Sequence, residues 1–271
     1  MKTLPRISVV VPSLNQARYL ELALRSILDQ GYPELELIVI DGGSEDGSTE
    51  IIRKYEQHMK FWCSEPDGGQ TQGIIKGFSH ATGEILCFLN SDDLFEPGVL
   101  REVGEYFYTH PGVDAVYGNA LWVDAEGNAL QLKKEIPFNR FIWLYTYNYI
   151  PGMSMFWRRE LYDRAGGLNP KFQLAFDSDL WIRFSDHGRI KHVARQWSRI
   201  RFYPEQKNRR LRAQSDYEDM LIRSRYWKNQ TMPRTYYLRR KIALGIRIIW
   251  KLLSGCYSLD YRKHLEDTEK A

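Results

Sequence analysis

Three short polar segments in this sequence each follow an apolar run, and their side chains are of the kinds that bind charged ligands. The segments are Pro12-Ser13-Leu14-Asn15, Asp41-Gly42-Gly43-Ser44 and Asn90-Ser91-Asp92-Asp93. Asp, Asn, Gly and Ser are also ordinary turn residues, so any one segment alone has a simpler explanation as a turn. Three of them at strand ends of one sheet favour a ligand site, because ligands of open α/β sheets bind beyond the carboxyl ends of the strands.

The adjacent carboxylates of Asp92 and Asp93 offer hard oxygen ligands, the type that Mg²⁺ or Mn²⁺ uses to bridge to a diphosphate. The simpler alternative for Asp93 is the capping of a helix. No GxGxxG follows the first apolar run of the sequence, and no GxxxxGK(S/T) occurs in it. The absence of these motifs disfavours a dinucleotide-dependent dehydrogenase and a P-loop NTPase. A nucleotide would have to be held in another way.

Alternating strands and helices are predicted to position these segments. Apolar, β-branched runs predict strands over residues 7–11, 35–40, 59–63, 84–89 and 155–157. Helical spacing predicts helices over 19–28, 48–55 and 71–81, with Ser13 or Asn15 as the cap of the first and Ser48 as the cap of the second. A further helix is expected to begin near Arg158 and to stop at Gly166. This order implies an α/β fold, an open, twisted, mainly parallel sheet flanked by helices.

The composition is that of a globular protein, with 43% hydrophobic and 27% charged residues, which excludes a disordered or collagen-like chain. No uncharged apolar run is long enough to predict a membrane-spanning helix. The first residues show no signal-peptide core, and the three cysteines form no CxxC pair. We therefore expect a reduced, cytoplasmic protein, and the spacing of histidines and cysteines does not favour a structural zinc site.

Five longer motifs carry a more specific resemblance. They are Ser8-Val-Val-Val-Pro-Ser-Leu-Asn15, Ile38-Val-Ile-Asp-Gly-Gly-Ser-Glu-Asp-Gly-Ser-Thr49, Ser64-Glu-Pro-Asp-Gly-Gly-Gln70, Gly83-Glu-Ile-Leu-Cys-Phe-Leu-Asn-Ser-Asp-Asp93 and Phe176-Asp-Ser-Asp-Leu-Trp-Ile-Arg183. From about residue 7 to 207 the chain resembles the inverting glycosyltransferases of family 2, which have the GT-A fold, and in particular the bacterial enzymes that build surface polysaccharide. The resemblance implies transfer of a sugar from a nucleoside-diphosphate sugar donor to a saccharide or lipid-linked saccharide acceptor, with Mn²⁺ or Mg²⁺ as cofactor, in surface polysaccharide or glycolipid biosynthesis.

The resemblance also assigns roles at the donor site. Asp41 matches the acid that hydrogen-bonds the nucleotide base, and Asp92 matches the metal-binding acid of the family's DxD signature. The other residues that it places near the nucleotide sugar are Pro12, Ser13, Asn15, Asp67, Lys76, Asn90 and Ser91. A divalent cation at Asp92 would offset the charge that develops on the diphosphate leaving group.

Two positions depart from the family pattern. Asn90 stands at the first position of the DxD signature, so metal binding depends more heavily on Asp92. Tyr203 stands where many relatives place a histidine that is sometimes a metal ligand. Both departures also motivate an alternative function, an inactive nucleotide-sugar-binding or scaffold protein at the membrane. A nucleotidyltransferase on a related sheet is disfavoured because its glycine-rich, basic first loop is absent from the sequence.

Asp177 and Asp179 precede the apolar run that begins at Leu180, and one of them could simply stabilise a helix start. The resemblance matches Asp177 to the base that deprotonates the acceptor hydroxyl, a role that this poor nucleophile requires. A single base and a direct displacement give inversion at the anomeric carbon. Asp179 is expected to support the helix or to pair with Arg183. For Trp181 core packing is expected first, and a place in the acceptor pocket second.

The positive charge of the chain is concentrated at its C-terminal end. Residues 201–271 hold 17 Lys and Arg against 8 Asp and Glu, whereas the whole chain has a net charge of only +4. Residues 236–256 have apolar residues on one helical face and Arg240, Arg247 and Lys251 on the other. We divide the chain into a catalytic domain, 1–215, and a basic helical extension, 216–271. The apolar face of the helix could dock on the catalytic domain, or the helix could bind an anionic membrane at the inner face of the plasma membrane or form a dimer contact; nucleic-acid binding is not expected.

Overall fold

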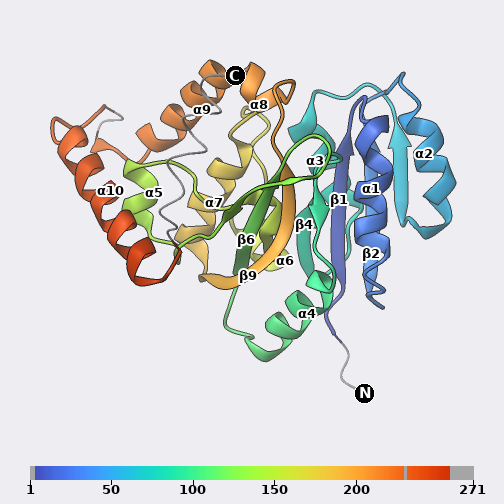
Figure 1. The fold of residues 1–271 in the computed structure, drawn as a ribbon, viewed down its shortest axis with the longest axis horizontal. Helices are drawn as coiled ribbons and strands as arrows, with labels where there is room; N and C mark the ends of the chain where they lie inside the picture. Colours follow the sequence, from blue (N-terminus) through green and yellow to red (C-terminus); the bar gives the residue numbers. More distant parts are fainter. Residues whose placement is uncertain (1–3, 229–230, 257–271) are drawn as a thin grey trace.

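The computed structural model describes residues 4–228 and 231–256, and one continuous sheet runs through this part of the chain (Figure 1). The strands lie in the order β3-β2-β1-β4-β8-β6-β9-β5, with β7 paired to β6 outside this path. Helices flank the sheet, so the predicted α/β class with an open sheet is confirmed. No helix among the described residues is both long and apolar enough to cross a membrane.

The first half of the sheet is parallel, as predicted. It consists of β1 (Ile7–Ser13), β2 (Leu35–Asp41), β3 (Phe61–Ser64) and β4 (Ile85–Phe88), connected through α1 (Ala17–Leu28), α2 (Ser48–Tyr55), the short η1 (Glu56–His58) and α3 (Gln70–His80). The central strands are buried throughout, as expected for strands that helices cover on both faces. Helix α3 packs closely on β1 because Gly77 has no side chain: a Cβ there would lie 2.4 Å from Cγ1 of Val10.

The predicted caps of α1 and α2 are wrong. Gln16 precedes α1 and Gly47, with a φ of 95°, precedes α2, and neither helix has a side-chain cap. The Ser48 hydroxyl instead accepts a hydrogen bond from the Gln16 amide at 3.1 Å and donates to Asp46 at 2.6 Å. Asn15 is used to connect two loops, since its side chain accepts from the Glu45 amide at 3.0 Å. These polar residues bind partners about thirty positions away, which the local pattern does not reveal.

The second half of the sheet is mixed. The strands are β5 (Leu94–Phe95), β6 (Ala115–Val123), β7 (Ala129–Lys133), β8 (Met155–Arg158) and β9 (Ile190–Arg201), of which β6 and β9 are parallel and the remaining pairs antiparallel. The helices here are α4 (Val99–Thr109), α5 (Arg140–Tyr145), η2 (Gly152–Ser154), α6 (Arg159–Arg164) and α7 (Phe176–His187). The strand predicted at 155–157 is confirmed as β8, and α6 ends shortly before Gly166. Buried aromatic rings, with Trp157 against Trp181 and Phe88, join this half of the core to the first.

Three helices complete the described chain: α8 (Lys207–Arg210), α9 (Arg212–Ser224) and α10 (Tyr236–Leu253). Helix α9 runs across the expected division between residues 215 and 216. Its Glu218 accepts hydrogen bonds from three successive amides, those of Gln173, Leu174 and Ala175, at 2.8–3.0 Å immediately before α7 begins. Helix α10 lies beside α5 at the end of the molecule opposite α2 (Figure 1).

Candidate active site

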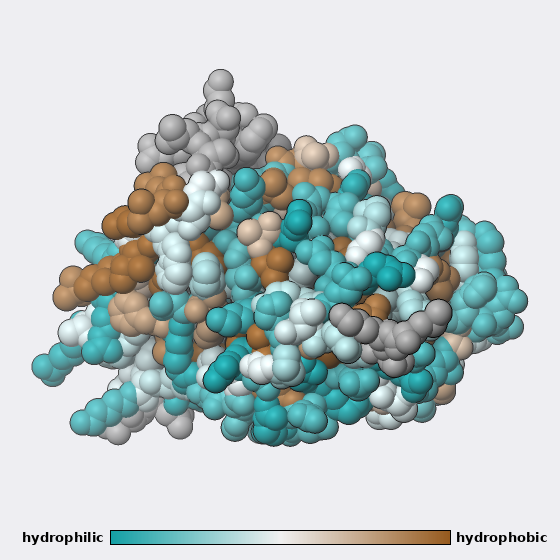
Figure 2. All heavy atoms as spheres, turned by 90° about the horizontal axis from the view of Figure 1, so that it is seen from below, coloured by the Kyte–Doolittle hydropathy of each residue, from teal (hydrophilic) through white to brown (hydrophobic). Residues whose placement is uncertain are grey.

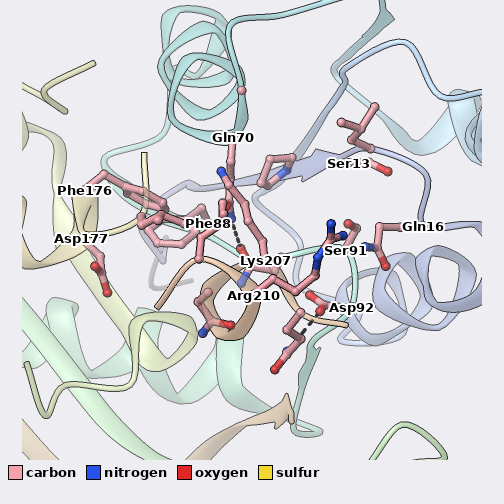
Figure 3. Close-up of a pocket in the computed structure, with 18 of the residues that line it drawn as sticks. Ser13, Gln16, Gln70, Phe88, Ser91, Asp92, Phe176, Asp177, Lys207 and Arg210 are labelled. Atoms are coloured by element: carbon pink, nitrogen blue, oxygen red, sulfur yellow. Dashed lines mark hydrogen bonds between the residues drawn. The ribbon is translucent and has the colours of Figure 1, made fainter. Parts of the chain in front are cut away.

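A partly open cavity of about 650 Å³ lies beyond the carboxyl ends of β1 and β4, and residues of α3, α7 and α8 contribute to its lining (Figure 3). The polar segment after β1 and the one after β4 therefore meet at one edge of the sheet, as the sequence predicts. Eight of the predicted site residues line this cavity: Pro12, Ser13, Asp67, Asn90, Ser91, Asp92, Asp177 and Tyr203. The hydroxyl oxygen of Ser13 is buried and has no hydrogen-bond partner in the described part of the chain, so it can bond to a ligand.

Two of the predicted nucleotide-binding residues, Asp41 and Asn15, do not line the cavity. The carboxylate of Asp41 is buried and accepts hydrogen bonds from the Ser44 hydroxyl at 2.6 Å, the Ser44 amide at 2.8 Å and the Ser64 hydroxyl at 2.7 Å. Asn15 binds the same loop, because its backbone amide donates to the Ser44 hydroxyl at 2.7 Å. In this structure both residues hold the loop after β2 in shape.

The structure does not bring four further predicted residues to the cavity wall. Lys76 lies on α3 and forms an ion pair with Glu65. Asp179 is fully buried and binds Arg183 at 2.6 Å and also Arg225 of the segment after α9. Trp181 is fully buried in the aromatic core, the placement expected first for it. Asp179 therefore connects α7 to the C-terminal helices.

Asp92 is the acid after β4 that presents its carboxylate to the cavity. The Tyr203 hydroxyl donates to its Oδ2 at 2.9 Å, and burial together with the charge of Asp92 raises the pKa of Tyr203, which keeps the phenol protonated. Asp93 lies behind it, buried, and accepts from the Arg201 amide at 2.8 Å. Burial and the neighbouring Asp92 hold the pKa of Asp93 well above its usual range. Asp93 is therefore a structural acid.

Asn90 connects the cavity wall to this buried acid. Its side-chain nitrogen donates to Oδ2 of Asp93 at 3.1 Å, and its side-chain oxygen accepts from Gln70 at 2.8 Å. An aspartate at this position would place a second carboxylate against Asp93, where the asparagine supplies a donor. The departure from the family's DxD signature therefore has a local physical reason.

The carboxylate oxygens of Asp92 are suitable ligands for a magnesium or manganese ion that also binds a diphosphate. No group of three or more His, Cys, Asp or Glu side chains that could hold a metal ion occurs among the described residues. In phosphate sites, however, Mg²⁺ uses one or two carboxylates and takes its remaining ligands from the phosphates and water. Asp92 fits this requirement, and the Tyr203 hydroxyl bonds to the oxygen that such an ion would use.

Two basic side chains from α8 enter the cavity between Asp92 and Asp177. In Figure 3 Asp92 and Asp177 lie on opposite sides, with Lys207 and Arg210 between them. Lys207 donates to the Gln173 carbonyl at 3.2 Å, and burial lowers its pKa. Neither residue belongs to the motifs that predict the site from the sequence. The signal was the basic run 207–210 that follows Tyr203, but the run alone does not show which side chains turn inward.

Asp177 lies in the first turn of α7, with part of its surface open to the cavity. Its Oδ1 accepts from the Ser178 amide at 2.7 Å, and its Oδ2 accepts from the side chain of Asn148 at 3.0 Å. Burial raises the pKa of Asp177 to about 6, so the carboxylate is basic enough to accept a proton near neutral pH. Asn148 was also missed in the sequence, where it stands in a stretch of aromatic and turn residues.

Comparison with known families shows to which family the chain belongs. The model of the family described as glycosyl transferase family 2 matches residues 8–167, which include β1, β4 and the polar segments that follow them. The chain belongs to glycosyl transferase family 2. This glycosyltransferase is 30% identical over 185 residues to an uncharacterized glycosyltransferase of Mycobacterium tuberculosis, covering 68% of the chain and 70% of the relative. It is also 30% identical over 186 residues to a PGL/p-HBAD biosynthesis glycosyltransferase of Mycobacterium bovis, covering 66% and 69%.

Solved structures show that this family 2 glycosyltransferase has the GT-A fold. S. aureus TarS 1–349 in complex with UDP-GlcNAc matches it with a TM-score of 0.67 at 18% identity, over 96% of this chain and 78% of that one. A longer TarS structure matches over 91% of this chain but only 43% of its own length. The mannosyltransferase PcManGT of Pyrobaculum calidifontis, in complex with GDP-Man and Mn²⁺, matches with a TM-score of 0.61 at 18% identity, covering 99% and 80%.

Proposed function

We propose that this glycosyltransferase is a metal-dependent, inverting enzyme. It moves a sugar from a nucleoside-diphosphate sugar to a hydroxyl of a saccharide or lipid-linked saccharide, in cell-surface polysaccharide or glycolipid biosynthesis. The observation that carries this proposal is one cavity with Asp92 on one side and a carboxylate of raised pKa, Asp177, on the other. The first is suited to the diphosphate and the second to the acceptor hydroxyl.

The donor is proposed to bind along the ends of β1 and β4. Ser13 offers an unpartnered hydroxyl, and the amide pair of Gln70 and Asn90 offers donors and acceptors for the ribose. Lys207 and Arg210 face the position of the diphosphate, where charged hydrogen bonds are strong. Mn²⁺ or Mg²⁺ held by Asp92 would supply further positive charge to the leaving group. The bound UDP-GlcNAc and GDP-Man of the two structural neighbours support a donor of this class.

Asp177 is proposed as the general base. It takes the proton of the acceptor hydroxyl while that oxygen forms a bond to the anomeric carbon and the bond from this carbon to the diphosphate oxygen breaks. The Asn148 amide holds the carboxylate from its other side, which fixes its orientation. Attack from the face opposite to the diphosphate inverts the configuration. Lys207 and Arg210 are placed to stabilise the departing nucleoside diphosphate.

Product analysis with candidate nucleoside-diphosphate sugars and Mn²⁺ tests this function. A glycosyltransferase releases a nucleoside diphosphate, whereas a nucleotidyltransferase releases pyrophosphate. Asp177→Asn is expected to abolish release, and Asp163→Asn, a change at an exposed acid on α6, is the matched control. Release of pyrophosphate, or full activity of Asp177→Asn, would refute the proposal.

The hydrogen bond from Tyr203 to Asp92 favours one alternative, a nucleotide-sugar-binding or scaffold protein without catalysis. Such a protein would bind the donor and release no nucleoside diphosphate with any acceptor. We place the enzyme at the inner face of the plasma membrane, with residues 1–215 as the catalytic part and 216–271 as the extension. The C-terminal helix supplies the argument for that location.

A further inference from the structure

Helix α10 has its charged side turned toward the protein. Arg247 binds the carboxylate of Glu135 at 2.9 Å and Lys251 binds it at 3.1 Å, and the side chain of Glu135 is fully buried. Ala243, on the same side of the helix, is also fully buried. Two of the three basic residues expected to face an anionic surface, Arg247 and Lys251, therefore bind inside the molecule, a correction to the simple amphipathic prediction.

Other inward contacts of α10 are polar or aromatic as well. Arg239 donates to the Tyr145 hydroxyl at 2.6 Å, and the ring of Tyr236 packs against those of Tyr145 and Trp227. The helix thus docks on the catalytic part through its basic side, and the expectation that its apolar face makes this contact is wrong. The contacts that hold it do not come from its row of isoleucines and leucines.

That apolar row faces outward. The side chains that the helical spacing places on one face are between 41% and 84% exposed: Leu238, Ile242, Ile246, Ile249 and Leu253. Tyr237, Ile248 and Leu252 extend the same surface and are also exposed. Figure 2 shows apolar side chains gathered at the end of the molecule that carries α10. A contiguous exposed surface of this kind marks an interaction site.

The charge around this row is of one sign. Residues 226–256 contain seven Lys and Arg and no Asp or Glu. Arg247 and Lys251 are neutralised by Glu135, but Arg240 and Lys241 are exposed and form no ion pair within the described residues. The exposed surface of α10 therefore combines the outward apolar row with the positive charges of Lys241 on its outer side and Arg240 at the border of its inner side, neither of which is paired among the described residues.

We propose that α10 is a membrane-binding surface that lies along a bilayer containing anionic lipid, with its apolar row inserted among the acyl chains. At 18 residues the helix is about 27 Å long. A bilayer surface provides hydrocarbon for Ile242, Ile249 and Leu253 and negative headgroups for Arg240 and Lys241. A second copy of the chain fits less well, because a symmetric contact would bring the same basic residues together.

This proposal names a partner of the glycosyltransferase that lies outside its donor site. Vesicle binding requires no donor, acceptor or turnover, so its failure would leave the transferase assignment untouched, and a failed product assay would leave the surface untouched. The proposal therefore has its own test.

The test is flotation of the full chain with vesicles of phosphatidylcholine alone and of phosphatidylcholine with phosphatidylglycerol. We expect binding to the anionic vesicles at low salt, loss of binding at high salt, and little binding to the neutral ones. Ile242→Ser/Ile249→Ser/Leu253→Ser should weaken binding by more than about a hundredfold. Arg240→Gln/Lys241→Gln should weaken it by about tenfold or more. Melting temperatures should stay near the wild-type value, because all five side chains are exposed.

Matched variants at other exposed positions test whether vesicle binding is specific to this surface or is a nonspecific effect of exposed apolar and charged side chains. Leu22→Ser/Leu130→Ser removes exposed apolar side chains on α1 and β7, and Arg53→Gln/Arg101→Gln removes exposed charge on α2 and α4. Both should bind vesicles like the wild type. Absence of wild-type binding to anionic vesicles, or equal loss in the matched variants, overturns the proposal. A wild-type dimer in light scattering that the Ile/Leu variant dissociates, without vesicle binding, would assign the surface to a second copy instead.

Discussion

The Tyr203 hydroxyl donates to Oδ2 of Asp92 at 2.9 Å, across 111 residues of sequence. A phenol therefore competes for the oxygen that a cation at Asp92 would use. Removing the hydroxyl leaves the carboxylate available, so metal binding and this hydrogen bond should oppose one another.

Tyr203→Phe is accordingly expected to strengthen Mn²⁺-dependent binding of a nucleoside diphosphate by about tenfold, the size of a hydrogen bond to a charged group. Isothermal titration calorimetry of UDP and GDP with and without Mn²⁺ measures this. Asp92→Ala is the reference variant and should lose the Mn²⁺-dependent part of binding. Equal affinity for wild type and Tyr203→Phe would show that the cation does not displace the phenol.

Asp177→Asn should lower kcat by about 10²–10⁴-fold, the usual contribution of a positioned general base. In the wild type kcat should rise with pH through about 6, as the carboxylate ionises. A pH–rate profile checks both points. A pH-independent rate between pH 5 and pH 8, or an unchanged rate in the variant, would assign the base elsewhere.

The raised pKa of Asp177 also predicts how stability changes with pH. The free energy of unfolding should fall as pH rises, whereas kcat should rise. Between about pH 4 and pH 6 the folded state keeps a proton that the unfolded state has lost, so stability falls as pH rises through this window. Asp177→Asn removes that penalty and should raise the free energy of unfolding at pH 8 by about 1–3 kcal/mol. Urea denaturation at pH 4 and pH 8 measures the difference, and a variant less stable than wild type at pH 8 would contradict it.

Asn90→Asp, which restores the DxD pattern, should destabilise the protein. The new carboxylate would face buried Asp93 at a contact that now measures 3.1 Å between donor and acceptor. The folded state would bind a proton more tightly than the unfolded state, so the loss of stability should grow as pH rises. Asn90→Ala removes the hydrogen bonds without adding charge, and its loss should vary less with pH. Parallel pH profiles for the two variants would rule out the charge explanation.

Arg210→Gln should weaken binding of a nucleoside diphosphate by about tenfold or more and leave binding of the nucleoside nearly unchanged, because only the diphosphate meets the guanidinium. Arg209→Gln is the neighbouring control: Arg209 packs over the ring of Phe202 and does not line the cavity. Calorimetry of UDP and uridine, and of GDP and guanosine, separates the two contributions. Equal losses of nucleoside-diphosphate affinity in Arg209→Gln and Arg210→Gln would indicate a general effect of net charge.

Glu135→Ala should cost about 3–5 kcal/mol of unfolding free energy, because it leaves Arg247 and Lys251 without their buried partner. Glu126→Ala breaks the exposed pair with Arg18 and should cost less than about 1 kcal/mol. Chemical denaturation compares them. Similar small losses in both would mean that α10 is not held by the buried acid.

Much of the first half of the fold follows from local pattern. The strands at 7–11, 35–40 and 84–89 are predominantly apolar runs, and such runs form buried parallel strands because both faces are covered. Parallel strands place their carboxyl ends at one edge, so the convergence of Ser13 and Asp92 on one cavity could be predicted. The helix caps could not be predicted from local pattern, because the Ser48 hydroxyl accepts a hydrogen bond from the backbone amide of Gln16 at the start of α1.

The sequence by itself indicated the α/β pattern and the family, and it selected Asp92 and Asp177 as candidates, which the structure brings to one cavity. Only the tertiary structure decided that Lys207 and Arg210 turn inward and that α10 docks through its basic side. Helical spacing shows that α10 has two faces, but it does not show which face is buried. Here a single buried acid, Glu135, more than a hundred residues earlier in the chain, attracts the basic face and leaves the apolar one outside. Such a long-range charge pairing depends on distances in space, which local sequence periodicity does not contain.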